Sequence, residues 1–393
     1  DDCLISYLPL AHVFEQGMIA VMILYGGKIG FYGGDMLKLT DDMRVLKPTV
    51  FPSVPRLYNK IYAKISGGVR SAAGLKGWMV NSAIDAKLQN LRAGKGYHHM
   101  LWDKIVFAKM KKIFGGHVRI MVTGSAPIAG EVLDFLKVCF SAPICEGYGM
   151  TETTASGCLT LAHDFESGHV GGPIQNVKIR LRDIPEMNYL GSADPPKGEI
   201  EFWGTNVMSG YFKNKEKTDE VLKDGWLSSG DVGQINPNGS IKIIDRAKNI
   251  FKLSQGEYIA PEKLENVYIQ STWIAQIWII GDSIRDYIIT FIVVEPEAVE
   301  KYAKENGTEF NEALLKDDKL RQIIFDDLVR LAGENKFNSL EKPKQMALLK
   351  QPWTVEDGHL TPTQKLKRAY AKQLYKEQME EMYKLEVMKP TKK

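Results

Sequence analysis

The sequence predicts an α/β protein: a large domain with a parallel α/β sheet and a small antiparallel β subdomain, followed by a smaller α+β domain. Three observations support this prediction. Up to about residue 160, apolar strand-like runs alternate with helical patterns, which is typical of a parallel sheet covered by helices. From about 168 to 245, short β-type runs are separated by Gly, Pro and Asn turns. Beyond Arg246, helical and strand patterns mix again over an ordinary domain length.

The composition limits the classes of protein to which the chain can belong. A length of 393 residues is too large for one ordinary core, so two or more domains are expected. The net charge of +3 is small and no arginine-rich run with interleaved aromatics occurs, so a nucleic-acid partner is not indicated. The four cysteines form neither a CxxC pair nor a zinc-finger spacing, which is typical of free thiols in a reducing compartment. A secreted protein is therefore not expected.

The first domain has the pattern strand, helix, strand, helix. Residues 49–51 have the character of a strand, and the helix predicted for residues 55–65 begins with a proline, which favours the first helical position. Residues 118–122 predict a second strand, and apolar residues at helical spacing give residues 131–140 one buried face. Because ligands bind past the carboxyl ends of the strands in such sheets, the segments after these strands are the first candidates for a site.

The elements predicted for the two following regions are shorter. The antiparallel subdomain is expected to contain strands at 177–181, 199–203 and 240–244, with a hairpin turn at 237–239. The last domain is expected to contain a helix at 261–270 and strands at 274–280 and 287–294. No repeat or low-complexity tract interrupts this order.

The segment Thr123-Gly124-Ser125-Ala126-Pro127 is the first candidate for ligand binding. It ends a predicted strand, its glycine lets a ligand approach the backbone, and a helix begins shortly after it. That geometry suits a nucleotide or phosphate. The same residues also fit a plain turn.

The segment Cys145–Gly157, with the sequence CEGYGMTETTASG, is the stronger candidate. Its tyrosine, Tyr148, lies between two glycines and offers a flat face for a base. The threonine hydroxyls and backbone N–H groups can hold phosphate oxygens, and the adjacent Glu152 can hold Mg²⁺, which prefers one or two carboxylates together with phosphates. We expect this segment to lie on a loop at the carboxyl end of a strand. The alternative is a Ser/Thr-rich surface loop.

Three charged residues farther along the chain are candidates for the same site. Asp231 follows a glycine turn and could accept two ribose hydroxyls, while Arg246 follows a hairpin whose length would bring it back alongside Asp231. An ordinary surface Asp–Arg pair is the alternative for both. Lys365 follows two threonines and a proline and precedes a predicted helix. It could supply positive charge to a phosphoryl transition state, or it could be solvated like most loop lysines.

Seven short motifs follow one another along the chain. They are Pro9-Leu10-Ala11-His12, Thr123-Gly124-Ser125-Ala126-Pro127, Glu146-Gly147-Tyr148-Gly149-Met150-Thr151-Glu152-Thr153, Ser229-Gly230-Asp231, Asp245-Arg246-Ala247-Lys248, Gln255-Gly256-Glu257-Tyr258 and Pro362-Thr363-Gln364-Lys365-Leu366-Lys367. In sequence and order they resemble the acyl-adenylate-forming, AMP-binding enzyme superfamily, and within it the long-chain fatty acyl-CoA synthetases of eukaryotic type. The resemblance covers nearly all of the chain, and the run from Ile244 to Lys263 resembles the long-chain subgroup in particular.

The resemblance implies a nucleotide site. Tyr148 and Gly147 would pack against adenine, Asp231 and Arg246 would hold the ribose, and Thr151 would touch the phosphates. The complete implied set of nucleotide-binding residues is Gly124, Ser125, Ala126, Glu146, Gly147, Tyr148, Thr151, Asp231 and Arg246.

The resemblance also implies catalytic roles. Glu152 would ligate Mg²⁺, Lys365 would bridge the fatty carboxylate and the α-phosphate, and His12 would be an aromatic gate beside the acyl pocket. The implied catalytic residues are Lys365, Thr151, Glu152 and His12. Lys248 would lie in a hinge, and Gly256 and Glu257 in the loop that meets CoA.

The mechanism implied has two steps and uses ATP, Mg²⁺ and CoA. The carboxylate of a long-chain fatty acid attacks the α-phosphorus of ATP and displaces pyrophosphate; the C-terminal domain then rotates, and CoA takes the acyl group and releases AMP. The implied organisation is an adenylating domain at 1–245 with a β subdomain at about 168–245, a hinge at 246–252 and a C-terminal mobile lid domain at 253–393.

The resemblance further implies peripheral membrane association, on the cytoplasmic face of an intracellular membrane such as the endoplasmic reticulum or in the cytosol, with no obligate protein partner. Members of the family carry a Gly/Ser/Thr-rich phosphate loop ahead of the Pro9–His12 motif. This sequence has none, so we expect it to be an N-terminally truncated part of a longer protein. Two alternatives stay open: a truncated or degenerate relative that binds nucleotide or acyl chain without ligation, and another adenylate-forming enzyme such as an aryl-CoA ligase or an amino-acid activator.

Overall fold

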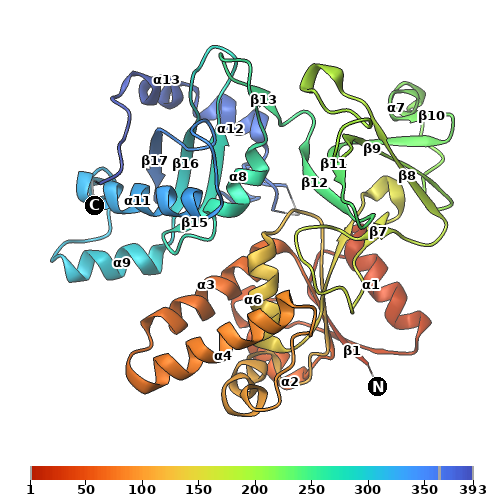
Figure 1. Ribbon diagram of the computed structural model, residues 1–393, viewed down its shortest axis with the longest axis horizontal. Coiled ribbons are helices and arrows are strands. Elements are labelled where there is room, and N and C mark those ends of the chain that lie inside the picture. Colours follow the sequence, from red (N-terminus) through yellow and green to blue (C-terminus); the bar gives the residue numbers. More distant parts are fainter. Residues whose placement is uncertain (1, 362–363, 392–393) are drawn as a thin grey trace. The chain divides into compact units, whose positions relative to one another are not determined.

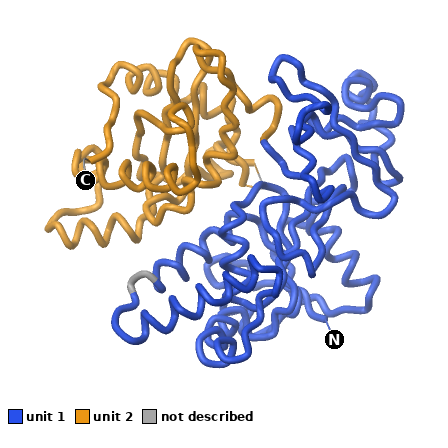
Figure 2. Tube along the Cα trace, in the orientation of Figure 1, with its two compact units in different colours: residues 1–244 blue, residues 245–393 orange. Residues whose placement is uncertain are grey.

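The computed structural model describes residues 2–361 and 364–391. The chain divides into two compact units, Asp1–Ile244 and Asp245–Lys393, which have separate colours in Figure 2. Each unit has a hydrophobic core of its own. The first unit contains the predicted site residues from His12 to Asp231, and the second contains those from Arg246 to Lys365.

Among the described residues, a seven-stranded sheet forms the centre of the first unit. Its order is β2-β1-β3-β4-β5-β6-β7; β1 to β5 run parallel, and the short β6 and β7 run antiparallel. The inner strands are apolar and buried, as a parallel sheet covered by helices requires. The strands are β1 Cys3–Ser6, β2 Lys28–Phe31, β3 Val50–Ser53, β4 Ile120–Thr123, β5 Ile144–Tyr148, β6 Cys158–Leu159 and β7 Gly172–Pro173.

Helices α3, α4 and α6 lie side by side next to this sheet (Figure 1). The sequence pattern predicts one buried face for α6, but nearly all of its second half is buried, because α3 and α4 pack against it in addition to the sheet. The helix predicted for 55–65 continues to Ser71, since Val69 beyond the two glycines is buried in the core. The helices are α1 Val13–Leu24, α2 Leu39–Leu46, α3 Pro55–Ser71, α4 Gly74–Arg92, a π-helix Asp103–Phe107, α5 Ala108–Lys111 and α6 Gly130–Phe140.

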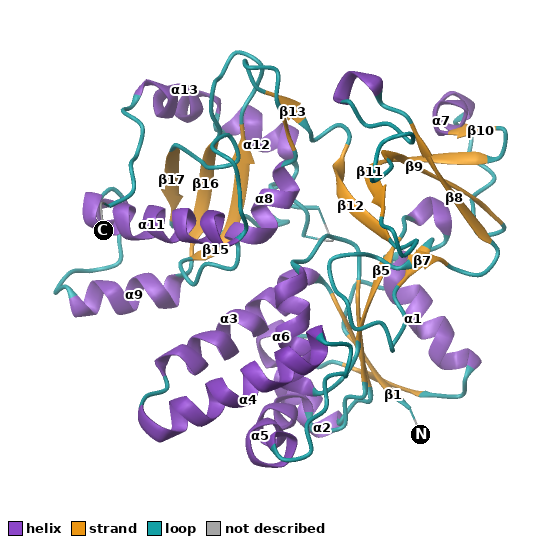
Figure 3. Ribbon diagram, viewed as in Figure 1, coloured by secondary structure: helices purple, strands orange, loops and turns teal. Residues whose placement is uncertain are grey.

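A smaller antiparallel sheet completes the first unit (Figure 3). Its order is β10-β11-β9-β8, with β12 beside β11. Alternate residues of β9, Ile200 and Phe202, face a core shared with Leu227 and Ile241. The turn predicted between the last two strands is present, with the N–H of Gly239 donating to the carbonyl of Asn236 at 2.9 Å. The elements are β8 Val177–Arg182, β9 Lys197–Gly204, α7 Lys215–Val221, β10 Leu222–Lys223, β11 Trp226–Ile235 and β12 Ile241–Arg246.

The second unit is built on a three-stranded sheet, counted over its described residues, with the order β15-β16-β17. Alternate residues of β16 belong to different apolar clusters, Ile292 and Val294 to one and Phe291 and Val293 to the other, so both faces of the sheet are covered. The elements are β13 Phe251–Lys252, β14 Tyr258–Ile259, α8 Pro261–Tyr268, β15 Ile274–Ile280, β16 Ile289–Val294, α9 Pro296–Glu305, α10 Glu312–Leu315, α11 Asp318–Glu334, β17 Gln345–Leu349, α12 Arg368–Leu374 and α13 Lys376–Lys384.

The predicted fold class is confirmed: an α/β sheet, a separate antiparallel sheet and an α+β unit are all present. Every predicted strand and helix is present, the strand at 274–280 with the predicted ends and the others with shifted ends, and β11 is one of several additional strands. All four cysteines are free thiols, three of them buried. Of the helices in the described part of the chain, none is both long and apolar enough to span a bilayer. The predicted domain roles, hinge and mobile lid included, stay predictions.

Candidate functional site

Three neighbouring strands of the large sheet end in residues with polar side chains. Ser6, Ser53 and Thr123 are the last residues of β1, β3 and β4, and all three are buried. Because parallel strands end at the same edge of a sheet, these hydroxyls and the segment that follows β5 share one edge. The predicted nucleotide residues 124–126 follow β4 directly and therefore lie at this edge as well.

Glu146, Gly147 and Tyr148 lie on strand β5, so the prediction that they lie on a loop is wrong. The last two of them pair antiparallel with β6, Gly147 opposite Leu159 and Tyr148 opposite Cys158. The chain turns back after Tyr148 and supplies its own partner strand, which a one-dimensional pattern does not show. As a result, the paired backbone fixes the direction of the tyrosine side chain.

A tight turn after β5 carries Thr151 and Glu152. Only glycine fits at position 149, because a Cβ would lie 2.1 Å from the carbonyl oxygen of Ala155. Thr151–Thr153 form one turn of 3-10 helix, in which Thr151 is exposed and Glu152 is half-buried. A hydroxyl and a carboxylate are thus presented next to each other at the end of the strand.

Both loops at this edge contain residues other than glycine in the left-handed backbone conformation. Ser125 has a φ of 70°, and the consecutive residues Thr154 and Ala155 have φ of 52° and 85°. Left-handed conformations cost residues other than glycine of order 1 kcal/mol each and cluster where a ligand is held. These loops are therefore candidates for the ligand-binding part of the sheet edge.

Tyr148 and Asp231, 83 residues apart in the sequence, are in direct contact: the tyrosine hydroxyl donates to Oδ2 of Asp231 at 2.8 Å. The tyrosine ring also packs against Phe202, with ring centroids 5.7 Å apart. Burial and the neighbouring carboxylate of Asp231 raise the pKa of Tyr148 well above its usual value, so the hydroxyl remains a donor at neutral pH. The face of an aromatic ring and a carboxylate are thus held next to each other.

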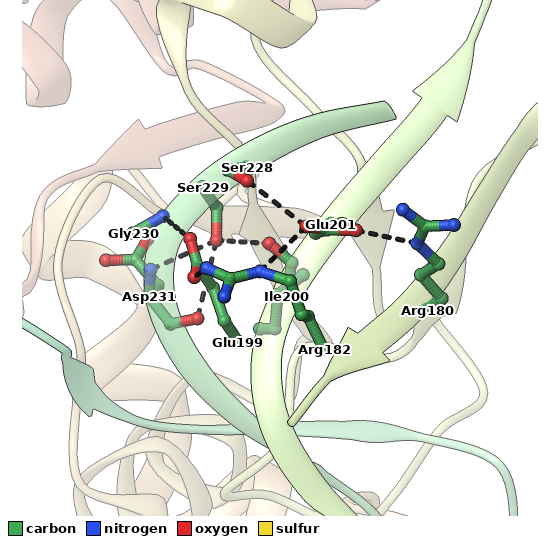
Figure 4. A network of polar contacts seen from close by, with 9 residues as sticks. All are labelled: Arg180, Arg182, Glu199, Ile200, Glu201, Ser228, Ser229, Gly230 and Asp231. Atoms are coloured by element: carbon green, nitrogen blue, oxygen red, sulfur yellow. Dashed lines mark hydrogen bonds and ion pairs between the residues drawn. The ribbon is translucent and has the colours of Figure 1, made fainter. Parts of the chain in front are cut away.

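A β-bulge in β11 presents Asp231. The pairing of β11 with β9 shifts register between Ser228 and Val232, and such bulges redirect a side chain. Ser229 holds the bulge: its hydroxyl donates to the carbonyl of Ile200 at 2.6 Å and accepts from the N–H of Asp231 at 3.0 Å (Figure 4). The position of the carboxylate therefore depends on β9 as well as on β11.

Two buried glutamates that the sequence analysis missed support the bulge from β9. Glu199 accepts from the N–H of Gly230 at 3.0 Å and also contacts Arg182. Glu201 is 2.6 Å from Nε of Arg180 and 3.0 Å from Nε of Arg182 (Figure 4). The signal in the sequence is the matched two-residue spacing of arginines in β8 and glutamates in β9, which predicts cross-strand ion pairs.

A segment that the sequence analysis did not single out, residues 206–211, holds Glu152; we call it the clamp segment. The hydroxyl of Tyr211 donates to Oε1 of Glu152 at 2.7 Å. The N–H of Met208 donates to the carbonyl oxygen of the same glutamate at 2.8 Å. Both the side chain and the backbone of Glu152 are therefore positioned from outside its own turn.

Asn206, also in the clamp segment, holds the rest of the strained turn. Its amide donates to the carbonyl oxygens of Thr153 at 3.0 Å and Ser156 at 2.9 Å. Its own carbonyl accepts from the hydroxyl of Thr154 at 2.9 Å. These bonds satisfy backbone groups that the tight turn leaves without partners, and so they help to stabilise its conformation.

The residues at this edge can hold a metal ion only if a bound substrate supplies further ligands to it. Within the described ranges, no group of three or more His, Cys, Asp or Glu side chains is arranged to hold a metal by itself. Mg²⁺ is commonly held by one or two carboxylates, with substrate phosphates and waters as its other ligands. Glu152, with the exposed Thr151 beside it, matches that donor set.

His12 begins helix α1 at the same edge of the large sheet. Its Nδ1 accepts the N–H of Phe14 at 3.2 Å, which caps the helix. In the first turn, the fully buried Glu15 accepts from the hydroxyl of Ser6 at 2.5 Å and ties the helix start to the end of β1. The position of His12 is thus well defined, while its role beside an acyl pocket stays a prediction.

Four of the remaining predicted residues lie in turns or at a strand end of the second unit. Arg246 ends β12, and its carbonyl accepts from the N–H of Asn249 at 2.9 Å, so Lys248 lies in a turn. Gly256 and Glu257 lie in the turn between β13 and β14. The predicted approach of Arg246 to the Asp231 carboxylate joins the two units and stays a prediction.

Lys365 lies ahead of helix α12 in the second unit. Its N–H donates to the hydroxyl of Thr361 at 3.1 Å, and its carbonyl accepts from the N–H of Thr361 at 2.8 Å. These two bonds hold the backbone of Lys365 against Thr361. Pro362 and Thr363, which belong to the predicted motif, lie outside the described residues.

Glu146 is expected to make the stability of the protein depend on pH. Its side chain is buried, Oε2 has no hydrogen-bond partner, and burial raises its pKa from 4.5 to about 8 against the opposing effect of Lys137. Between these values the folded protein holds a proton that the unfolded chain releases, so the free energy of unfolding should fall as the pH rises from about 4.5 to 8.

A variant that cannot ionise tests this expectation. In Glu146→Gln, the free energy of unfolding should fall less as the pH rises from about 4.5 to 8. The variant should therefore gain stability relative to the wild type over this pH range, as measured by urea unfolding at several pH values. Parallel curves for the two proteins would show that Glu146 is ionised in the folded state.

Comparisons with known proteins identify the family. The profile of the family described as "AMP-binding enzyme" matches residues 1–212. The chain is 43% identical over 385 residues to "Long-chain-fatty-acid--CoA ligase 1" of Homo sapiens, covering 98% of this chain and 55% of that protein. It is 44% identical over 385 residues to "Long-chain-fatty-acid--CoA ligase 5" of Rattus norvegicus, covering 98% of this chain and 56% of that protein. The chain thus spans just over half the length of these relatives.

Solved structures agree with the sequence matches. The adenylation domain of a carboxylate reductase from Mycobacterium chelonae has a TM-score of 0.79 and 27% identity, covering 97% of this chain and 54% of that chain. The corresponding domain from Segniliparus rugosus, solved in complex with AMP and a co-purified carboxylic acid, has a TM-score of 0.76 and 27% identity, covering 97% of this chain and 54% of that chain. With more than half of its residues matched by the family profile, the chain belongs to the AMP-binding enzyme family.

Proposed function

We propose that the protein of which this chain is part activates long-chain fatty acids to acyl-CoA at the expense of ATP, through an acyl-adenylate. The observation that carries the proposal is the contact between Tyr148 and Asp231 at the sheet edge that also presents Glu152. The choice of substrate rests on the identity of 43% to proteins named long-chain-fatty-acid–CoA ligases.

The residues of the first unit are proposed to bind ATP. Adenine packs on the face of Tyr148, and Asp231 accepts from the ribose hydroxyls. Thr151 donates to the phosphates, and the strained backbone at 124–126 lines the adenosine. Mg²⁺, held by Glu152 and the phosphates, neutralises charge on the nucleotide when it is bound.

The residues of the second unit are proposed to divide the two half-reactions between them. Lys365 bridges the fatty carboxylate and the α-phosphate while pyrophosphate leaves, and its positive charge stabilises the developing negative charge. Rotation about the hinge at Lys248 then withdraws it and brings the loop of Gly256 and Glu257 to CoA. A domain rotation of this kind lets one site serve two different transition states.

We propose peripheral association with a membrane, because fatty acids of the proposed length partition into lipid. The proposed location is the cytoplasmic face of an intracellular membrane or the cytosol. A fatty acid, ATP and CoA are the proposed partners. No nucleic acid or obligate protein partner enters the proposal.

Pyrophosphate release by a full-length protein carrying this chain tests the proposal. The rate should depend on ATP and on a long-chain acid, and it should rise with acid chain length, because a buried methylene gains roughly 0.8 kcal/mol of binding. A preference for aryl or amino acids would favour another adenylate-forming enzyme. Binding of nucleotide without pyrophosphate release would favour a degenerate binding protein.

Tyr211→Phe is expected to weaken the binding of Mg²⁺ during adenylation. Without the hydroxyl, Oε1 of Glu152 loses the 2.7 Å hydrogen bond that positions it. Hydrogen bonds to charged groups contribute roughly 1.5–3 kcal/mol, so the Mg²⁺ concentration at half-maximal rate should rise about tenfold. Titrations with Mg²⁺ at saturating ATP measure this, and Tyr25→Phe, on a tyrosine that is 81% exposed, is the control. An unchanged Mg²⁺ dependence would contradict the positioning role.

A further inference from the structure

The hairpin formed by α3 and α4 has a one-sided charge. Both helices project from the sheet and return beside each other (Figure 1). Over the whole chain, 51 Lys and Arg nearly balance 48 Asp and Glu, yet residues 55–84 contain no acidic residue. The cations of this stretch are Arg56, Lys60, Lys64, Arg70 and Lys76.

The three lysines within residues 55–84 are exposed, and none of them forms an ion pair with another described residue. Lys60 and Lys64 are four residues apart on the outer stripe of α3, and Lys76 is exposed in the first turn of α4. Like charges at this spacing destabilise an isolated helix slightly. No carboxylate within residues 55–84 offsets that cost, and the first acidic residue of α4 is Asp85. The net positive charge of the stretch favours an external anion.

Two large exposed apolar side chains flank Lys76 at the start of α4. Leu75 is 74% exposed and Trp78 is 64% exposed. A spacing of three residues places them on the same side of the helix. Tryptophan has an apolar body with one polar N–H and is enriched at membrane–water interfaces.

The start of α4 packs closely against the residue that caps the end of α3. A Cβ on Gly77 would lie 2.1 Å from the carbonyl oxygen of Ala72, so the connection between the helices packs tightly against α4. Val69, in the last turns of α3, is buried in the main core. The exposed leucine and tryptophan therefore lie in the first turns of α4, where Gly77 packs against Ala72.

We infer that this end of the hairpin, called the hairpin tip and made of Lys60, Lys64, Leu75, Lys76 and Trp78, docks on an anionic lipid surface. The two apolar side chains enter the headgroup layer, and the lysines contact lipid phosphates. A basic helical surface with Trp and Leu binds interfaces in this way. A projecting end suits a planar bilayer better than the groove of an acidic protein. The inference stands on charge and exposure and needs no nucleotide.

A second exposed apolar surface offers a control. It lies at the end of α1 and includes Ile23 and Leu24, which are 69% and 76% exposed. The charges next to it are mixed: the backbone of Lys28 pairs with that of Asp2, whose carboxylate forms an ion pair with Arg119. It therefore lacks the positive field that would favour anionic lipid over neutral lipid.

Sedimentation of this chain with vesicles tests the inference. Binding should require phosphatidylserine and should be weak on pure phosphatidylcholine. A cation near an anionic surface contributes roughly fivefold to partitioning, so the triple variant Lys60→Gln, Lys64→Gln, Lys76→Gln should lose binding by more than tenfold. Its matched control, Lys28→Gln, Lys223→Gln, Lys242→Gln, removes the same charge from exposed lysines elsewhere and should keep most of the binding.

The apolar pair is tested separately. Leu75→Ser with Trp78→Ser should reduce binding strongly, whereas Ile23→Ser with Leu24→Ser should not. Should the serine pair fail to fold, the conservative Trp78→Phe suffices: brominated lipids should quench the fluorescence of the wild type more than that of Trp78→Phe. The inference is overturned if charge removal at the tip and at the control lysines has equal effects, if the end of α1 proves to be the binding surface, or if the chain ignores anionic vesicles, which would favour an acidic protein partner.

Discussion

Replacing Lys365 by alanine in a full-length protein that carries this chain is expected to slow acyl-adenylate formation by about a hundredfold or more. The reason is electrostatic: a charge held ready for the phosphoryl transition state contributes on the order of 3 kcal/mol. Thioester formation from supplied acyl-adenylate should be largely unaffected, since the proposed rotation withdraws the lysine before CoA reacts. Pyrophosphate release measures the first half-reaction, and acyl-CoA formation from synthetic acyl-adenylate measures the second.

The separation of the two half-reactions is the decisive part of this prediction. Lys372→Ala, on an exposed lysine of α12, is the matched control and should change neither rate. Equal loss in both half-reactions would mean that Lys365 supports the fold or the CoA step, and the proposed role would have to be abandoned.

Lys87→Met is expected to lower the free energy of unfolding by about 3–5 kcal/mol, the range found when one partner of a buried ion pair is removed. The lysine is fully buried, with Nζ 2.6 Å from Oδ1 of Asp103, 2.6 Å from the carbonyl of Val138 and 2.7 Å from the hydroxyl of Ser141. Methionine has nearly the same length, so the main loss is that these partners become unsatisfied. Urea unfolding measures the change.

Two further variants test whether the lost ion pair causes the destabilisation. Lys104→Met, on an exposed lysine of the same region, should change stability by no more than about 0.5 kcal/mol. Adding Asp103→Asn to Lys87→Met should restore part of the loss, because the unpaired carboxylate is then neutral. A Lys87→Met protein as stable as the wild type would contradict the ion-pair account.

The fold follows from the sequence where hydrophobic periodicity is strong. The predicted strand at 274–280 agrees with β15 at both ends, because the apolar run that contains it lies between Ser271-Thr272 and Gly281-Asp282. β11 was missed because the Ser-Ser-Gly-Asp stretch in its middle has the composition of a turn; only the paired β9 and the bulge make it a strand.

The sequence predicted those site residues that lie in one short segment. It did not predict those that the fold brings together from distant parts of the chain. Tyr148 and Glu152 were found because glycines, hydroxyls and a carboxylate crowd into one short segment. Glu199 and Tyr211 were not, since each acts on a residue tens of positions away. Alternating Glu and apolar residues in β9 resemble a solvent-facing strand, and only the covering arginines of β8 show that the glutamates are buried.

The clamp segment has a practical consequence for protein engineering. Gene shuffling between relatives that exchanged residues 145–160 alone would combine a turn from one parent with the Asn206 and Tyr211 of another. Because the hydrogen bonds between these two pieces hold the turn in shape, they should be inherited together. Crossovers placed before β5 and after Tyr211 should therefore give active hybrids more often than crossovers placed between them.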